Sequence, residues 1–278
     1  MKKISRRSFM AAAAVSVASL ALTACGGSAS SAASSVASSA ASSEAASSAA
    51  AAELTTVEAG KLTMATNATF PPYEMTTDSG EIEGIDVDTA KAIAEKLGLE
   101  LQIDDMDFDA ALLSVQQGKA DIVMAGVTVT DERKAVMDFS DSYATGIQSI
   151  IVPNDSDIAS PDDLAGKKIG TQRGTTGYIY CSDDFGEDSV VAYDNGLTAV
   201  QALNNGQVDA VVIDNAPATE YVAANPGLKV LDTSYAEEDY AIGMAKGSAL
   251  EDAVNKALEE LKADGTLQAI VDKYINAN

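Results

Sequence analysis

The strongest constraint on the fold is a helix–strand unit that the sequence uses twice, in residues 112–121 and again in residues 200–209. Each copy predicts a helix that ends at a glycine, then two residues and an aspartate, then an apolar strand. Aligning the two glycines also aligns Gly126 with Asp214, so each predicted strand ends in an unusual residue. Ligands of open α/β sheets bind beyond the carboxyl ends of strands. Two such ends facing each other predict a ligand-binding cleft.

One lip of this cleft is the stretch from Asp121 to Arg133, which begins as a buried strand. Gly126 lets the backbone approach another group closely, and Asp131 is expected to cap a helix. Arg133 falls in the first helical turn, where a cation opposes the helix dipole, so helix stability does not explain it. Its planar guanidinium matches a carboxylate. We interpret the stretch as a carboxylate site, the alternative being a strand, a turn and a solvated arginine. With Asp214 on the other lip, the pair would suit a zwitterion.

The other elements alternate along the chain. Residues 61–124 predict a strand–helix–strand–helix–strand order, so a parallel sheet is expected. These elements are a strand at 61–66, a helix at 87–97 capped by Asp86 or Asp88, a strand at 99–103, a helix at 109–117 and a strand at 122–124. Further strands are expected at 148–152, 167–171, 190–193, 211–214, 228–231 and 239–245. Helices are expected to start at Pro161, near 174–177 and near Pro217, and to span 249–262 and 266–275.

The composition excludes several kinds of chemistry. The sequence has no histidine, which removes Ser-His and Cys-His nucleophile pairs and histidine-ligated zinc. Its formal net charge of −24 will repel nucleic acid and anionic lipid, and is compatible with an exported soluble receptor. No cofactor, metal site or nucleic-acid partner is expected. Cys181 has no intramolecular partner if Cys25 is modified, and is expected to be a partly buried structural thiol.

Residues 1–56 predict export and membrane attachment. Residues 1–24 have a basic start and an Ala-rich apolar run, which is typical of a signal peptide and too short for a stable membrane span. Leu22-Thr23-Ala24-Cys25 looks like a bacterial lipobox. Cys25 is therefore expected to carry a lipid that anchors the protein to the outer face of the cytoplasmic membrane, and 25–56 to form a Ser/Ala-rich tether. Ser5-Arg6-Arg7 leaves twin-arginine export open.

From about residue 57 to residue 277 the sequence resembles the family 3 solute-binding proteins, which are receptors of polar amino-acid ABC importers. Five segments carry the resemblance: Ala65–Tyr73, Gly84–Asp88, Thr130–Arg133, Phe139–Ser140 and Gly170–Gly177. The resemblance implies an α/β fold of the two-lobe, type II periplasmic-binding-protein kind, whose parallel-type lobes are joined by two hinge strands. Lobe 1 would comprise 57–146 and 242–278, and lobe 2 would comprise 147–241. Receptors of this class close around a ligand by hinge motion.

The resemblance also implies partners and site residues. The partners would be a free amino acid and the permease subunits of an ABC transporter, with the receptor a monomer and not an enzyme. Arg133 would hold the ligand α-carboxylate, helped by the backbone at Gly126 and Thr128. Thr176 would also help to hold the carboxylate, and Thr175 would belong to the same site.

The rest of the site follows from the same resemblance. Asp214 would hold the α-ammonium group, and Phe70 and Phe108 would pack on the ligand. Asn67 and Gln172 would lie near its side chain. The residues themselves leave alternatives open, because either phenylalanine could belong to the core and Asp214 could simply cap a helix.

One departure from the family pattern concerns the ligand. Many relatives carry aspartate at the Asn67 position, and some carry lysine at Gln172, whereas both are neutral amides here. This favours a neutral polar ligand such as glutamine. Two other functions remain open: an enzyme on the same fold, such as a dehydratase that uses cleft carboxylates, and a sensor, which would need a membrane span or signalling domain after Asn278.

Overall fold

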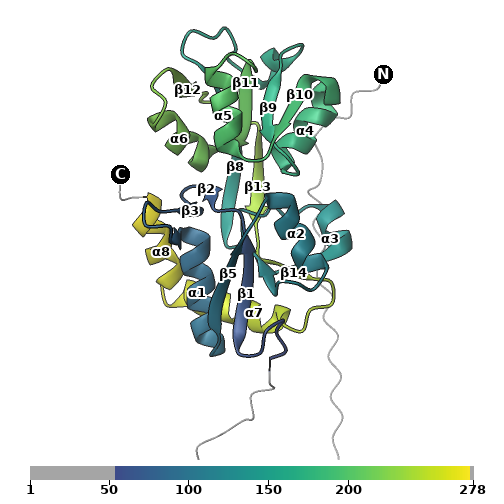
Figure 1. Ribbon diagram of the computed structural model, residues 1–278, viewed down its shortest axis with the longest axis vertical. Helices are drawn as coiled ribbons and strands as arrows, with labels where there is room; N and C mark the ends of the chain where they lie inside the picture. The colour runs from purple at the N-terminus through teal and green to yellow at the C-terminus, as the bar shows by residue number, and fades with distance from the viewer. Residues whose placement is uncertain (1–53, 276–278) are drawn as a thin grey trace, which may run out of the picture. The chain divides into compact units, whose positions relative to one another are not determined.

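The computed structural model describes residues 54–275, which form two β-sheets flanked by helices (Figure 1). The first sheet has five strands. Its middle strand pairs are parallel, β1 with β5 and β1 with β6, whereas β14 is antiparallel to both of its neighbours. In spatial order the strands are β5 (Glu100–Asp105), β1 (Lys61–Thr66), β6 (Ile122–Val123), β14 (Gly243–Ala245) and β7 (Met137–Phe139).

The second sheet has six strands and repeats this mixed arrangement. Strands β10, β9 and β11 are parallel to one another, and β8 pairs antiparallel with β11, β12 and β13. The strands are β10 (Val190–Tyr193), β9 (Ile169–Gln172), β11 (Ala210–Asp214), β8 (Ala144–Pro153), β12 (Leu228–Val230) and β13 (Ala236–Tyr240). The parallel pairing expected from the sequence therefore holds within each sheet only for the strands that helices connect.

Strands β8 and β13 connect the two sheets. They run antiparallel, with Ala144 opposite Tyr240 and Gln148 opposite Ala236. Figure 1 shows this pair passing from the lower group of elements to the upper group, so the expected two-lobe architecture is confirmed. The stretch 239–245, expected as one strand, is two: β13 belongs to the connection, and β14 begins after a break at Ala241 and Ile242. The lobe limits at residues 146 and 241 stay predictions.

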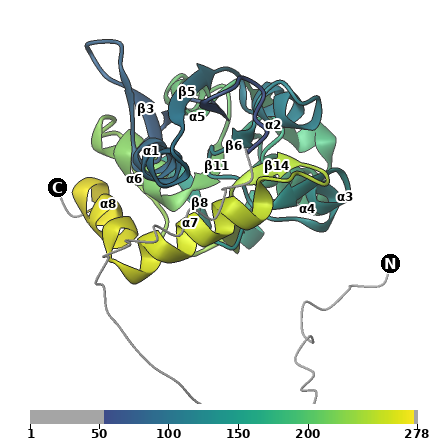
Figure 2. The same cartoon turned by 90° about the horizontal axis from the view of Figure 1, so that it is seen from below.

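Helices cover both sheets. The lower lobe has α1 (Ile85–Leu97), α2 (Phe108–Gln116), α3 (Asp131–Val136), α7 (Glu251–Ala263) and α8 (Thr266–Ile275), and the upper lobe has α4 (Thr176–Phe185), α5 (Gly196–Asn204) and α6 (Asn215–Ala223). Figure 2 shows α7 and α8 running together beneath the lower lobe. The helix expected at Pro161 is a short 3₁₀ helix, η1 (Pro161–Leu164), and a second, η2 (Glu187–Ser189), follows α4. The helix expected near Pro217 begins at Asn215.

Two expected helix caps are wrong. The N-cap of α3 is Thr130, whose hydroxyl accepts a hydrogen bond from the N–H of Arg133 at 3.2 Å, and Asp131 is the first helical residue. The N-cap of α1 is Gly84, and neither Asp86 nor Asp88 caps this helix, because both already lie in its first turn. Only a glycine fits at this cap, because a Cβ on Gly84 would lie 2.1 Å from the carbonyl oxygen of Tyr73.

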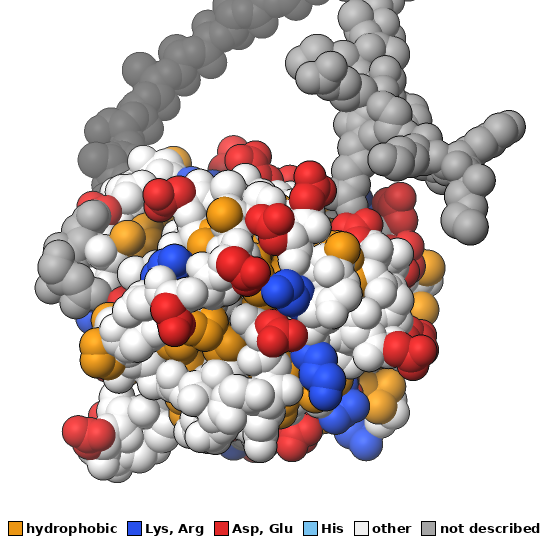
Figure 3. Space-filling model, turned by 90° about the horizontal axis from the view of Figure 1, so that it is seen from above, with side chains coloured by type: hydrophobic (Ala, Val, Ile, Leu, Met, Phe, Trp, Pro, Cys, Tyr) orange, Lys and Arg blue, Asp and Glu red, His pale blue; other side chains and the backbone are white. Residues whose placement is uncertain are grey.

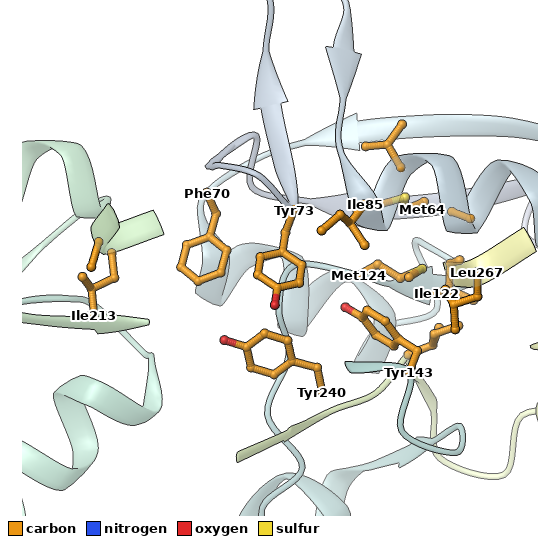
Figure 4. Packing of buried hydrophobic residues seen from close by; sticks show 14 of the residues in the cluster. Met64, Phe70, Tyr73, Ile85, Ile122, Met124, Tyr143, Ile213, Tyr240 and Leu267 are labelled. Atoms are coloured by element: carbon orange, nitrogen blue, oxygen red, sulfur yellow. The ribbon is translucent and has the colours of Figure 1, made fainter. Parts of the chain in front are cut away.

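A small sheet and a row of aromatic rings connect the lower core to the cleft. The sheet consists of β2 (Thr69–Phe70), β3 (Glu74–Thr76) and β4 (Ile82–Glu83). The Phe70 and Tyr73 rings lie 5.8 Å apart, and Tyr73 meets Tyr240 edge-on at 5.4 Å. In Figure 4 these rings stand between Met124 of the lower lobe and Ile213 of the upper lobe. The largest apolar cluster thus contains buried residues from both lobes.

Candidate ligand-binding site

All ten ligand-binding residues expected from the sequence line one cavity between the lobes. The lining residues are Asn67, Phe70, Glu74, Phe108, Ala125, Gly126, Thr128, Arg133, Gln172, Thr175, Thr176 and Asp214. Only Glu74 and Ala125 in this set were not expected. The expected lipidation site, Cys25, lies outside the described residues. The other cysteine, Cys181, is fully buried and forms no disulfide among the described residues, and burial raises the pKa of its thiol to about 12.

Arg133 is held rigidly at one end of the cavity. Its guanidinium donates to the carbonyl oxygens of Thr128 at 2.8 Å and Gly174 at 3.1 Å, and lies 5.4 Å from the centre of the Phe108 ring. The side chain is buried, and burial lowers the pKa of the guanidinium. Within residues 54–275 no carboxylate forms an ion pair with it. A buried cation without a partner of opposite charge is costly, so the site calls for an anionic ligand group.

The start of α4 completes this anion site. Thr175 is the N-cap, and its hydroxyl oxygen accepts a hydrogen bond from the N–H of Tyr178 at 3.3 Å. The first N–H groups of a helix have no partner within the helix and attract negative charge. Thr176, the first residue of α4, lines the cavity across from Thr128, with 3.5 Å between their hydroxyl oxygens. A carboxylate beside Arg133 would therefore also face a helix N-terminus.

Gly126 is needed for close packing, and its N–H is already used. Its φ of 56° lies in the left-handed region, and a Cβ there would lie 2.8 Å from the Phe70 ring. The N–H donates to Asp86 at 3.0 Å. Gly126 therefore cannot offer this N–H to a ligand carboxylate, which corrects the role expected from the sequence. The carbonyl of Thr128 likewise serves to orient Arg133.

Asp214, the last residue of β11, lines the same cavity. One carboxylate oxygen accepts a hydrogen bond from Nε2 of Gln148 at 2.8 Å, and the other accepts one from the hydroxyl of Tyr240. Asp214 occupies the N-cap position of α6, but its side chain makes no capping hydrogen bond there. Burial raises the pKa of this carboxyl well above its ordinary value, and the nearby Glu238 adds to the shift. A ligand ammonium group would supply the cation that stabilises the ionised form.

Glu238, on the connecting strand β13, is a buried acid that the sequence analysis missed. Its carboxylate accepts hydrogen bonds from the hydroxyl of Thr128 at 3.0 Å and from Nε2 of Gln148 at 2.9 Å. These bonds join Thr128 of the cavity wall and Gln148 of the connecting strand β8 to the connecting strand β13. Its position in an exposed-looking Glu-Glu-Asp run, Glu237 to Asp239, gave no signal of burial.

Asn67 and Gln172 contact each other across the cleft. Nε2 of Gln172 donates to Oδ1 of Asn67 at 3.0 Å, and Nδ2 of Asn67 donates to the carbonyl of Met106 at 2.8 Å. Both amides lie at the cavity wall as expected, yet part of their hydrogen-bonding capacity is already satisfied within the protein. They close one side of the cavity as well as lining it.

The sequence analysis also missed Glu74, the unexpected residue that most changes the charge of the cavity wall. It lies on β3 and is fully buried, and neither of its carboxylate oxygens accepts a hydrogen bond from a donor in the described residues. Burial, followed by repulsion from Asp86, raises the pKa of Glu74 well above its ordinary value. The available signal was a glutamate directly after the Pro71-Pro72-Tyr73 loop, at an inward position of a short strand. The cavity wall thus carries one cation, Arg133, and two carboxyl groups, Asp214 and Glu74.

Comparison with known proteins identifies the family. Residues 62–277 match the bacterial extracellular solute-binding proteins, family 3. The chain belongs to this family. The solute-binding protein is 33% identical to the L-cystine-binding protein TcyJ of Escherichia coli (strain K12) over 225 residues, covering 80% of this chain and 85% of that protein. It is 34% identical to the arginine-binding extracellular protein ArtP of Bacillus subtilis (strain 168) over 219 residues, covering 77% and 86%.

A solved structure supports the fold as well. An ancestral arginine-binding protein bound to glutamine superposes with a TM-score of 0.73 at 43% sequence identity, covering 78% of this chain and 98% of that chain. The type II two-lobe fold is therefore confirmed, and so is the expectation that this solute-binding protein is not an enzyme. Within the described residues, no helix is both long and apolar enough to cross a membrane, and no group of three or more acidic, cysteine or histidine side chains could hold a metal ion.

Proposed function

We propose that this solute-binding protein is the receptor of an ABC importer and captures one polar amino acid in the cavity between its lobes. The observation that carries the proposal is the arrangement of charge. Arg133 and Asp214 are both buried in the wall of this cavity, and neither forms an ion pair within residues 54–275. An α-amino acid presents the complementary carboxylate and ammonium groups. The names of the relatives, which include arginine-, cystine-, histidine- and glutamine-binding proteins, support the same class of ligand.

The side chain of the ligand depends on Glu74. The neutral amides of Asn67 and Gln172 favour a neutral ligand such as glutamine, and that preference stays untested. The burial of Glu74 weighs against it, because a carboxyl group with no donor in the protein would accept hydrogen bonds from a cationic side chain. We therefore place arginine first among the candidates and glutamine second.

The cellular setting is also part of the proposal. The receptor would be exported, lipidated at Cys25 and held at the outer face of the cytoplasmic membrane, where it would act as a monomer and deliver its ligand to permease subunits. Acidic side chains are spread over the face shown in Figure 3, in keeping with a formal net charge of −24. This charge disfavours nucleic acid as a partner.

Calorimetry of the exported form against a panel of amino acids tests the function. Arginine, lysine, histidine, glutamine and cystine should be titrated separately, with product analysis after each titration. We expect saturable one-to-one binding of at least one of them, arginine most tightly, and recovery of the ligand unchanged. Absence of binding by every member of the panel, or chemical conversion of a ligand, would contradict the proposal.

A further inference from the structure

Two carboxyl groups, Glu74 of β3 and Asp86 of α1, are fully buried beside the cavity. The backbone fixes their proximity. Gly84 packs directly on Tyr73, with its Cβ position only 2.1 Å from the Tyr73 carbonyl oxygen, and the N–H of Asp86 donates to that same oxygen at 2.9 Å. The first turn of α1 is therefore attached to the strand that carries Glu74, and the two carboxyl groups remain neighbours whatever occupies the cavity.

The two carboxyl groups differ in the donors around them. Asp86 accepts a hydrogen bond from the N–H of Gly126 through one oxygen, which favours its ionised form. Glu74 accepts nothing from a donor in the described residues. Each carboxyl is the other's hydrogen-bonding neighbour, and two carboxyl groups can share a hydrogen bond only when one of them keeps a proton. The proton therefore belongs on Glu74.

Among the described residues, no cation acts on the pair to allow both groups to ionise. The other charged groups that act on Glu74 are Asp105 of β5 and Asp214 of β11. Both are carboxyl groups, so neither supplies a positive charge. The remaining titratable neighbours of the pair are the phenols of Tyr73, Tyr143 and Tyr221. Arg133 lines the same cavity but is bound to Thr128 and Gly174. Consistent with this geometry, burial raises the pKa of Asp86 to about 6 and raises that of Glu74 further above its ordinary range.

We propose that the ligand-free receptor stores one proton on the Glu74–Asp86 pair, and that a cationic ligand side chain expels it to solvent. The guanidinium or ammonium group of the ligand takes the place of the proton: the O–H bond of Glu74 breaks, the proton leaves to water, and the resulting carboxylate pairs with the ligand cation. A neutral ligand would leave the proton in place and accept a hydrogen bond from Glu74. This inference rests on the proposed function. It means that release of the proton from the pair lets the receptor distinguish cationic from neutral ligand side chains.

The linkage has a definite sign. Ligand binding and proton binding oppose each other, so the affinity for a cationic amino acid rises as the pH rises. If one proton is released, the affinity changes by up to about tenfold per pH unit between the pKa values of the bound and free pair. The affinity for glutamine should not follow this slope.

Calorimetry at one pH in two buffers, phosphate and Tris, measures the number of protons released. The buffers differ in ionisation enthalpy, so the observed binding heat differs between them in proportion to the protons that they take up. With the wild-type receptor near neutral pH, we expect about one more proton released per arginine bound than per glutamine bound, because the ammonium group common to both ligands acts on Asp214 alike. The E74Q variant should lose this difference. D86N should reduce it, because Glu74 would then ionise without a neighbouring charge. D121N is the matched control and should release as many protons as the wild type, because Asp121 is a buried carboxylate of the same lobe that accepts N–H donors from Val57 and Thr63.

An infrared difference spectrum gives a second readout that needs no variant. The band of protonated carboxyl groups should be present in the ligand-free protein and should lose more intensity on addition of arginine than of glutamine, because both ligands bring an ammonium group to Asp214 and only arginine brings a second cation. Arginine binding with no more proton release and no greater loss of this band than glutamine binding would overturn the inference while leaving the receptor function intact. If glutamine binds and neither arginine nor lysine does, the inference also fails and the receptor function still stands. If no amino acid binds, the proposed function fails as well.

Discussion

At the scale of single residues, the site depends on a few buried charged side chains that form no ion pair within residues 54–275. Arg133 donates to two carbonyl oxygens, which hold its position without neutralising it. Asp214 and Glu74 face the same cavity. A zwitterion bound there would place a carboxylate beside Arg133 and an ammonium group beside Asp214.

Gly126 provides a test at this scale. G126A should lower stability by about 1–2 kcal/mol because the residue has a positive φ, and it should also weaken ligand binding because the new Cβ pushes on the Phe70 ring. G118A is the matched control, since Gly118 has a φ of 65° but nothing within 4 Å of its Cβ position. Urea unfolding should show a similar loss for both variants, whereas calorimetry should show weakened binding only for G126A. Equal binding by the two variants would contradict the role given to Gly126.

The sequence alone predicted much of the site because its residues stand in aligned motifs at strand ends. Arg133 and Asp214 could be found this way, since a cation in a first helical turn and an aspartate ending an apolar strand are both unusual. Glu74 and Glu238 could not be found, because each lies on a short or charged strand that is typical of a surface. Their burial depends on tertiary contacts, such as Gly84 against Tyr73, that no local pattern records.

At the scale of elements, the junction of β3 with the start of α1 is the unit that most affects stability and pH response. Sequence periodicity located α1 but not β3, and it assigned the cap of the helix to an aspartate. The actual cap, Gly84, allows the helix to start in contact with the chain at Tyr73. This contact brings Asp86 inward, where it bonds to Gly126 instead of capping the helix.

This junction predicts how stability depends on pH. The pKa values of Asp86 and Glu74 are raised in the folded protein, so the folded state holds protons that the unfolded chain has already released. The ligand-free protein should therefore lose stability as the pH rises from about 4 to beyond 6. Thermal melting across this range measures the effect, and D86N should show a shallower decline than the wild type. A melting temperature that stays level or rises over this window in the wild type would contradict the assignment.

At the scale of the whole receptor, the described lobes meet through direct hydrogen bonds as well as through the cavity. The hydroxyl of Tyr221 on α6 donates to the carbonyl of Thr69 on β2 at 2.5 Å, and Gln172 contacts Asn67 on the facing lobe. Only two strands, β8 and β13, connect the lobes covalently in a continuous pair. The structure therefore has the features of a closed state, in which a ligand would contact both lobes.

Ligand should shift the receptor toward this closed state, since it binds that state better. Small-angle scattering should show a smaller radius of gyration with saturating ligand than without it. Identical scattering curves would count against closure.

Tyr221 makes an interlobe hydrogen bond but does not line the cavity. A variant at this position therefore tests closure without changing a residue of the cavity wall. Y221F removes an interlobe hydrogen bond worth about 0.5–1.5 kcal/mol, so the affinity should fall by roughly 2- to 10-fold. The ligand-free form should become more open by scattering. A variant with unchanged affinity and unchanged scattering would show that this contact has no part in closure.

The central claim is that a ligand carboxylate neutralises Arg133 inside the closed cavity, and a double-mutant cycle between protein and ligand tests it most directly. Removing one partner of a buried charge pair costs about 2–5 kcal/mol, or roughly 30-fold to several thousandfold in affinity.

Calorimetry should compare the wild type with R133A, each against arginine and against arginine amide. We expect R133A to bind arginine at least roughly 30-fold more weakly than the wild type, and R133K to recover little, because an ammonium group cannot reproduce the planar fork. Amidation should then harm the wild type far more than R133A, because the two changes remove the same interaction. If R133A binds arginine within about threefold of the wild type, a difference of only about 0.7 kcal/mol, the carboxylate site is not at Arg133.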